Sequence, residues 1–362
     1  CQDKQPGISK HELQNRLTQL ESRVLDNLIF IEGGTFIMGD FGAVGEDGVW
    51  RPYFPPTAER NTSHEVTLSS YSMSQHKTTW GDFDTYLLAN DLPFIVQAFT
   101  KSWERTPFDQ EPESRFFVEK PATVTWQEAK DYCQWLGAQT DLPLDLPTSA
   151  QWEFAGRNRG SKDWIFSTHD GKDPHLYYQQ TQPRQGGEFV PIGSRLPPNP
   201  LGLYDMADNG KEWVNDWFSE TWYRENPKVT DPQGPDEGTQ KIVRNLDFSF
   251  SRIGVPESTP STFNDEWTLI ITNTFRCALQ AVAPKQAEHS KPRSEQASLE
   301  PAALDFLARA RAEHEIPTEP GVCIPFGFIA DSGNEPFDFG YQWRPRSTPA
   351  LLYRIDQPAS SE

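Results

Sequence analysis

Proline and glycine set the strongest limit on how this chain can fold. Its 362 residues include 31 prolines and 24 glycines, and both residue types interrupt long regular elements and favour turns. No segment approaches the roughly 18 consecutive apolar residues that a membrane-spanning helix needs. We therefore expect an α+β protein with few and short regular elements, whose association with a membrane would need a covalent anchor.

Apolar residues recur with helical spacing near the start of the chain. In residues 11–28 they fall at steps of three and four, on Leu13, Leu17, Leu20, Val24 and Leu28, which predicts a helix that packs on the main domain. A two-stranded coiled coil is the alternative, but it would cover barely two heptads. Shorter helices are predicted at residues 125–136, capped by Thr125, and at residues 149–157, and residues 30–39 are predicted to form a strand, a glycine turn and a second strand.

The chain is predicted to divide into four parts. Residues 1–28 form a polar tether and the amphipathic helix, residues 29–284 the main domain, and residues 285–300 a polar linker without periodicity. Residues 301–362 are predicted to hold a short helix and three strands, near residues 322–328, 337–343 and 351–355. A turn at residues 331–334 would join the first two strands as a hairpin. This small β unit needs a surface to cover, so we expect it to dock on the main domain or to take part in binding.

The chain is strongly acidic, with a formal net charge of −19 and a sequence pI near 4.8. This charge repels nucleic-acid phosphates, so we expect no DNA or RNA binding. It suits a basic protein partner, although a high net charge also serves solubility alone.

The four cysteines lie at positions 1, 133, 277 and 323, too far apart for a zinc-type cluster. The three interior cysteines can form at most one disulfide, and the sequence leaves open which pair. Cys1, followed by a polar stretch, is typical of a bacterial lipoprotein after removal of its signal peptide. We expect acyl chains on Cys1 to anchor the protein in the periplasm, with Gln2 favouring the outer membrane.

Five blocks of the main domain together resemble the formylglycine-generating, sulfatase-modifying family. They lie in order across about seventy per cent of the chain: FIEGGTFIMGD at 30–40, the helix near 124–136, LPTSAQWEFAGR at 146–157, NPLGLYDMADNGKEWVNDW at 199–217 and FRCA at 275–278. The resemblance implies a fold similar to C-type lectins. Because members of one fold differ in function, any activity has to be carried over residue by residue.

The resemblance does not extend to the residues of the family's oxidation chemistry. Formylglycine-generating enzymes bind copper(I) through two cysteines upstream of the FRCA-like strand, and thiolates are the ligands this ion prefers. The matching stretch here, VRNLDFSFSRIGVP at 243–256, has no cysteine, nor does any position between Cys133 and Cys277. The iron-binding branch similar to ergothioneine sulfoxide synthases uses three histidines, and the seven histidines here show no HxH or HxxxH spacing. We therefore expect neither copper nor iron.

Calcium is the ion that the resemblance leaves open. Positions matching Asn209, Gly210 and Glu212 supply oxygen ligands to a structural calcium in members of the family, and oxygen ligands suit this ion. Lys211 lies in the same loop and is unfavourable unless it points outward. The alternative is that Glu212 only accepts hydrogen bonds from the protein itself.

These observations predict a non-catalytic lipoprotein that faces the periplasm and binds a protein. The expected partner is a secreted antibacterial effector of the type VI kind, for which the chain would serve as the immunity protein, or else a component of a secretion system. Two long insertions, residues 41–65 and 93–120, offer aromatic contact residues: Trp50, Tyr53, Phe54, Phe94, Trp103 and Phe108. The alternative is an enzyme similar to the pyoverdine-maturation branch of the family, which also lacks the cysteine pair. An open, polar pocket beside the FRCA-like strand would favour it.

Overall fold

The computed structural model describes residues 8–53, 61–98, 101–173, 189–245, 257–260 and 273–280, and two short strands near the end of the chain. The chain forms two compact units, Cys1–Ala281 and Val282–Glu362. The division falls within three residues of the predicted start of the linker. Among the described residues, no helix is both long and apolar enough to cross a membrane.

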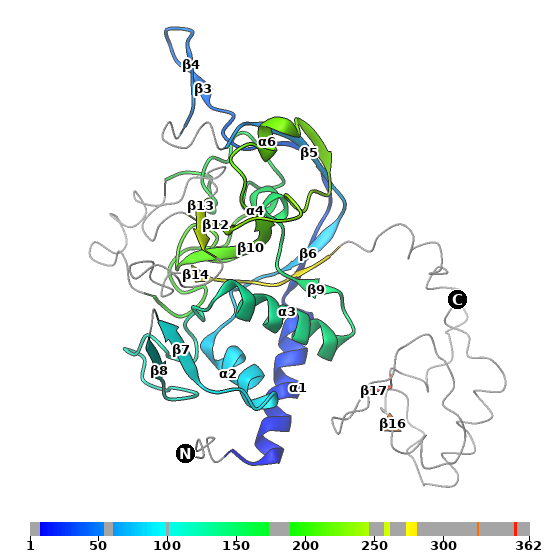
Figure 1. Cartoon of the computed structure of the whole chain (residues 1–362), viewed down its shortest axis with the longest axis vertical. Helices are drawn as coiled ribbons and strands as arrows, with labels where there is room; N and C mark the ends of the chain where they lie inside the picture. Colours follow the sequence, from blue (N-terminus) through cyan, green and yellow to red (C-terminus); the bar gives the residue numbers. More distant parts are fainter. Residues whose placement is uncertain are drawn as a thin grey trace, which may run out of the picture. The chain divides into compact units, whose positions relative to one another are not determined.

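In its described residues the first unit combines short helices with three sheets of three or four strands and two two-stranded hairpins; Figure 1 shows their arrangement. Its helices are α1 (Lys10–Asp26), α2 (Trp80–Ala89), α3 (Trp126–Thr140), α4 (Ser149–Gly156) and α6 (Trp222–Glu225). One sheet has the order β1 (Leu28–Ile31), β6 (Tyr71–Ser74), β15 (Ala278–Leu279), β9 (Leu144–Asp145). A second has the order β13 (Glu257–Pro260), β12 (Gln240–Arg244), β10 (Lys211–Trp217), β14 (Asn273–Thr274), and a third has β11 (Lys228–Thr230), β5 (His64–Leu68), β2 (Gly34–Met38). The α+β class with few regular elements is confirmed.

Local sequence accounts for where the three predicted helices begin. The hydroxyl of Ser9 accepts a hydrogen bond from the Glu12 amide at the start of α1. Thr125 and Thr148 each form a reciprocal capping box, with Glu128 in α3 and with Gln151 in α4. Such caps satisfy amide groups that the first turn of a helix leaves without a partner.

Two apolar clusters form the core of the first unit. One lies among α1, α2 and α3 and includes the buried Leu20 of the predicted stripe, with Val24 and Leu28 packed against it. The other lies around β2, β5, β6 and α4 and includes the fully buried Trp152. The amphipathic helix therefore packs on the domain.

A disulfide joins Cys133 of α3 to Cys277, and both residues are buried. The sequence had left the pairing open. Cys277 directly precedes β15, so the bond connects the helical cluster to the last strand of the first unit. The bond thereby closes a loop across a sequence separation of 144 residues.

The two long insertions form hairpins where the structure describes them. In the first, β3 (Ala43–Val44) pairs with β4 (Trp50–Arg51), and Figure 1 shows this hairpin standing out from the rest of the unit. Asp47 and Arg51 brace it with two hydrogen bonds of 2.9 and 2.6 Å. In the second, β7 (Ile95–Ala98) pairs with β8 (Lys101–Glu104).

In the second unit the structure describes one pair of strands, β16 (Ile324–Pro325) and β17 (Leu351–Leu352), which are antiparallel. The first predicted strand of the C-terminal extension therefore pairs with the third. The hairpin predicted between the first and second strands lies outside the described residues, as does the predicted helix.

Candidate functional site

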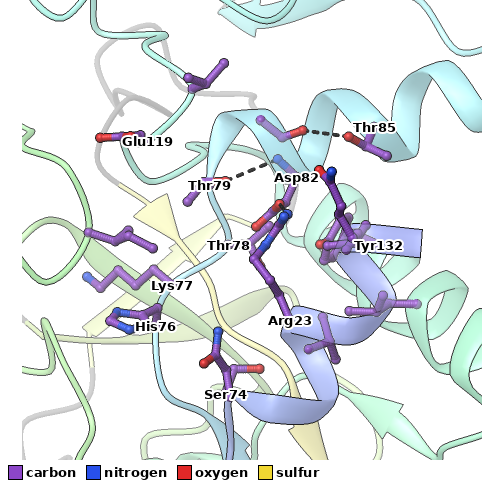
Figure 2. Close-up of a pocket in the computed structure, with 18 of the residues that line it drawn as sticks. Arg23, Ser74, His76, Lys77, Thr78, Thr79, Asp82, Thr85, Glu119 and Tyr132 are labelled. Carbon is purple, nitrogen blue, oxygen red and sulfur yellow. Dashed lines mark hydrogen bonds and ion pairs between the residues drawn. The ribbon is translucent and has the colours of Figure 1, made fainter. Parts of the chain in front are cut away.

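A cavity of about 510 Å³ opens beside α1, the start of α2 and α3. Its wall mixes polar and apolar side chains, and Cys277 of the FRCA segment is part of it. Figure 2 shows Arg23 of α1 reaching toward Asp82 of α2, with which it forms an ion pair. The pocket therefore has a mixed polar and apolar wall and borders the FRCA segment.

His76 lines this pocket from the segment that follows β6. Its ring stacks on Tyr204, with 4.7 Å between the ring centroids. Burial, together with the nearby charge of Arg276, lowers the pKa of His76 to about 4. At neutral pH the imidazole is uncharged, so it can act as a hydrogen-bonding group but not as a cation.

Lys77, the next residue, is fully buried, and its ammonium group lies among backbone oxygens. Nζ donates to the carbonyl oxygens of Asp208, Asn209 and Gly210 at 2.8, 3.1 and 2.5 Å. It also lies 3.6 Å from Oε1 of Glu212. An ammonium has three N–H groups, so the three carbonyl oxygens take up all its donors.

Arg276 completes this charged cluster by binding both carboxylate oxygens of Glu212. Its Nε and Nη2 donate to the two carboxylate oxygens of Glu212 at 2.7 and 2.9 Å. Its remaining donors reach the carbonyl oxygens of Ser74, Gln75 and Tyr204. Burial opposes the charge on Glu212, but Arg276 and Lys77 hold the pKa of its carboxyl group below the ordinary value. Glu212 is therefore an anion held by two cations of the protein itself.

This arrangement bears directly on the predicted calcium site. The structure brings Asn209, Gly210 and Glu212 together, as the resemblance implied. However, the two carbonyl oxygens and the carboxylate are bound to Lys77 and Arg276. A calcium ion would need the same oxygen atoms, so the residues as arranged do not fit it.

A second buried charged cluster lies at α4. The Glu153 carboxylate accepts from Arg157 at 2.8 Å, from Arg244 at 2.6 Å and from the amide of Gly39 at 2.9 Å. All three charged side chains are almost fully buried. The cluster ties β2, α4 and β12 together, and nothing in it faces the pocket described above.

Asp216 of β10 is a buried carboxyl group next to this cluster. Burial raises its pKa to about 6, although the amide of Ser149 donates to Oδ2 at 2.7 Å. A carboxyl group with a raised pKa in the folded state contributes stability that is present below its unfolded pKa of 3.8 and is lost as the pH rises through about 6.

We therefore expect Asp216→Asn to change how stability depends on pH. Asparagine keeps an oxygen that can accept from Ser149 but cannot ionise. The difference between 3.8 and about 6 corresponds to about 3 kcal/mol. Urea unfolding from pH 7.5 to pH 4 should show wild type gaining up to about that amount relative to the variant. A difference that stays constant over this range would contradict the raised pKa.

The aromatic residues predicted to contact a partner have different environments. Trp50 is 52% exposed on β4, and Tyr53 is half-buried, edge-on to Phe41. Phe94 is partly buried against the helical core. Phe108 is buried, with the guanidinium of Arg16 4.2 Å from its ring centre. Phe54 and the side chain of Trp103 lie outside the described residues.

Sequence reasoning missed Lys77 and Arg276 as members of the charged cluster. Arg276 lies within the FRCA block, so a search for a basic partner of Glu212 could have singled it out. Lys77 belongs to none of the five sequence blocks. The residues that it contacts lie more than 130 positions further along the chain, so the local sequence does not indicate its role. The stretch at 246–256, where the copper-binding cysteines would fall, lies outside the described residues.

Comparison with known proteins identifies the same family that the five sequence blocks resemble. The sulfatase-modifying factor enzyme 1-like domain matches residues 14–279. A formylglycine-generating enzyme from Thermomonospora curvata is 32% identical over 270 residues, covering 62% of this chain and 83% of that protein. The serine/threonine-protein kinase pkn1 of Chlamydia caviae is 24% identical over 67% of this chain, which spans only 36% of that relative's length. A solved structure of PvdO from Pseudomonas aeruginosa superposes with a TM-score of 0.51 at 22% identity, covering 70% of this chain and 94% of PvdO.

Proposed function

Because the chain belongs to the family of sulfatase-modifying factor enzyme 1-like domains, we propose that it uses this fold to bind a protein partner rather than to generate formylglycine. The observation that carries the proposal is the projecting β3–β4 hairpin, with three exposed apolar side chains on a strongly acidic protein. The chemistry of the cysteines supports it.

The cysteines leave no thiol pair for copper. Cys133 and Cys277 are bonded to each other and buried, and no cysteine lies between them in the sequence. The remaining two, Cys1 and Cys323, lie outside the described residues and far apart in the sequence. Copper(I) is bound by soft thiolate ligands, and the family uses two closely spaced cysteines for it, so we propose that this chain forms no copper–thiolate centre.

The β3–β4 hairpin has the features of a contact surface. Val44, Val49 and Trp50 are exposed by 66, 51 and 52%, which places three apolar side chains on one short hairpin. The indole nitrogen of Trp50 donates to the Phe41 carbonyl at 2.9 Å. That bond fixes the ring while leaving much of it free, as in the aromatic residues that dominate protein interfaces.

The net charge indicates which kind of partner fits. A protein with a formal charge of −19 attracts basic proteins and repels acidic ones. We propose a basic, secreted antibacterial effector as the partner, with this chain as its immunity protein. The alternative partner, also a protein, is a component of a secretion system.

Capture with the full chain from the cell envelope of the source organism tests this proposal. We expect a stoichiometric, basic partner to be retained by wild type. Trp50→Ala should weaken its affinity by at least about 30-fold, since truncating a central aromatic residue commonly costs 2 kcal/mol or more. Isothermal titration with the purified partner gives the affinity, and thermal unfolding of the free variant should match wild type.

Phe30→Ala is the matched control, because Phe30 is an exposed aromatic residue, at 69%, on a different sheet. It should leave affinity unchanged. A partner that binds Trp50→Ala as tightly as wild type would show that the hairpin is not the contact surface. Recovery of no protein partner would contradict the proposed function itself.

We also propose that the protein is exported and anchored through Cys1. The buried Cys133–Cys277 disulfide supports export, because such bonds persist in oxidising compartments such as the periplasm. The intact mass of the protein purified from membranes tests the anchor in the same preparation, since acylation of Cys1 adds the mass of its fatty chains.

A second candidate is an enzyme similar to the pyoverdine-maturation branch. The pocket favours it, because it is open, carries polar as well as apolar side chains and is bordered by Cys277 of the FRCA segment. In the capture experiment this candidate predicts a bound small molecule and no stoichiometric protein. Arg23→Ala would then reduce retention of that molecule, because Arg23 lies at the pocket beside Asp82.

A further inference from the structure

The most unusual polar feature of the described structure is the Lys77 ammonium in its oxygen cage. We define this cage by the carbonyl oxygens of residues 208–210 and the carboxylate of Glu212. We infer that the Lys77 ammonium takes the place of a bound metal cation there, and that removing it creates a binding site for calcium.

The geometry of the loop is that of a cation site. Three consecutive carbonyl oxygens converge on one point, between 2.5 and 3.1 Å from Nζ. Asn209 and Gly210 both adopt positive φ, at 58° and 101°, a conformation that turns successive peptide groups and is costly for most residues. The loop thus holds a conformation whose carbonyl groups need a positive charge to offset their mutual repulsion.

A second contact holds the loop in this form independently of Lys77. The side-chain amide of Asn245 donates to the carbonyl oxygens of Asp208 and Gly210, both at 2.9 Å. Asn245 itself is buried and has a positive φ of 65°. The oxygen atoms would therefore remain in place if the lysine side chain were removed.

The charges around the cage also favour a cation. Glu212, Asp205 and Asp208 all act to keep Lys77 protonated, whereas burial and Arg276 act against it, and the pKa of Lys77 falls only to about 8. The ammonium is therefore charged at neutral pH. Carbonyl and carboxylate oxygens in this number are the ligands that calcium prefers, and a small variant side chain leaves room for the waters that complete its coordination.

The test compares Lys77→Ala with wild type in calcium and in chelator. We expect wild type to unfold at the same temperature in both, because its own ammonium fills the cage. Lys77→Ala should be less stable in chelator, and its Tm should rise by about 5 °C in millimolar calcium through preferential binding to the folded state. Isothermal titration should detect calcium binding to the variant and none to wild type.

Lys130→Ala is the matched control, since Lys130 also binds a carboxylate, Asp145 at 2.8 Å, but lies outside the cage. Its Tm should not respond to calcium. An equal response of the two variants would overturn the inference, as would loss of stability of wild type in chelator. If Lys77→Ala does not fold in chelator, refolding on addition of calcium supports the inference. Failure of both Lys77→Ala and Lys77→Ser to respond to calcium overturns it.

Discussion

Loss of the Cys133–Cys277 disulfide is expected to destabilise the first unit by about 5 kcal/mol. The bond closes a loop across a sequence separation of 144 residues, and the chain-entropy model gives a cost of this size for a loop of that length at 25 °C. The double variant Cys133→Ala/Cys277→Ala should therefore unfold at a much lower urea concentration, with a Tm lower by more than about 10 °C.

Wild type treated with a thiol reductant in urea provides the control for this prediction. Reduction should bring its unfolding curve close to that of the double variant, whereas the variant itself should not respond to the reductant. A double variant within 1 kcal/mol of wild type would show that the packing around α3, and not the covalent link, holds the helical cluster to β15.

Glu153→Ala is the second change for which we expect a large effect, a loss of about 4 kcal/mol. The substitution leaves Arg157 and Arg244 facing each other in the interior and the Gly39 amide without its acceptor. Removing one partner of a buried ionic cluster commonly costs 3–5 kcal/mol, because the remaining charges cannot be solvated. Urea unfolding at neutral pH measures this loss directly.

Two further variants serve as comparisons, one in this cluster and one at an exposed ion pair. Glu153→Gln keeps an acceptor for Gly39 but not the charge, so it should lie between wild type and Glu153→Ala. Glu32→Ala removes an exposed partner of Arg159 and should cost less than about 1 kcal/mol. If Glu153→Ala lowered the free energy of unfolding no more than Glu32→Ala does, the Glu153 carboxylate would not be what stabilises the two buried arginines.

The sequence predicts the helices of this protein better than its sheets, for a physical reason. The caps at Ser9, Thr125 and Thr148 act within a few residues of where they occur, so α1, α3 and α4 begin close to their predicted positions. Strand pairing is set by distant segments. The two strands predicted in residues 30–39 both form, but β1 pairs with β6 whereas β2 pairs with β5, in separate sheets.

The same distinction applies to the candidate site. Glu212 could be singled out from its block, but its role depends on Lys77 and Arg276, which lie 135 positions before it and 64 positions after it. Burial is equally hard to read from composition: Phe108 lies in a long insertion, yet its side chain is buried and its amide donates to the buried Asp84 carboxylate at 2.6 Å. The exposure of Trp50 is easier to predict, because this residue lies in a short hairpin whose two strands are close in the sequence.

The position of the disulfide also governs how the first unit responds to mechanical load. Cys277 lies four residues before Ala281, where the unit ends. A pull on the segment beyond Ala281 can strip the two-residue strand β15 from its neighbours, but it then meets a covalent bond to α3. Tension therefore passes into the helical core instead of unravelling the chain from its end.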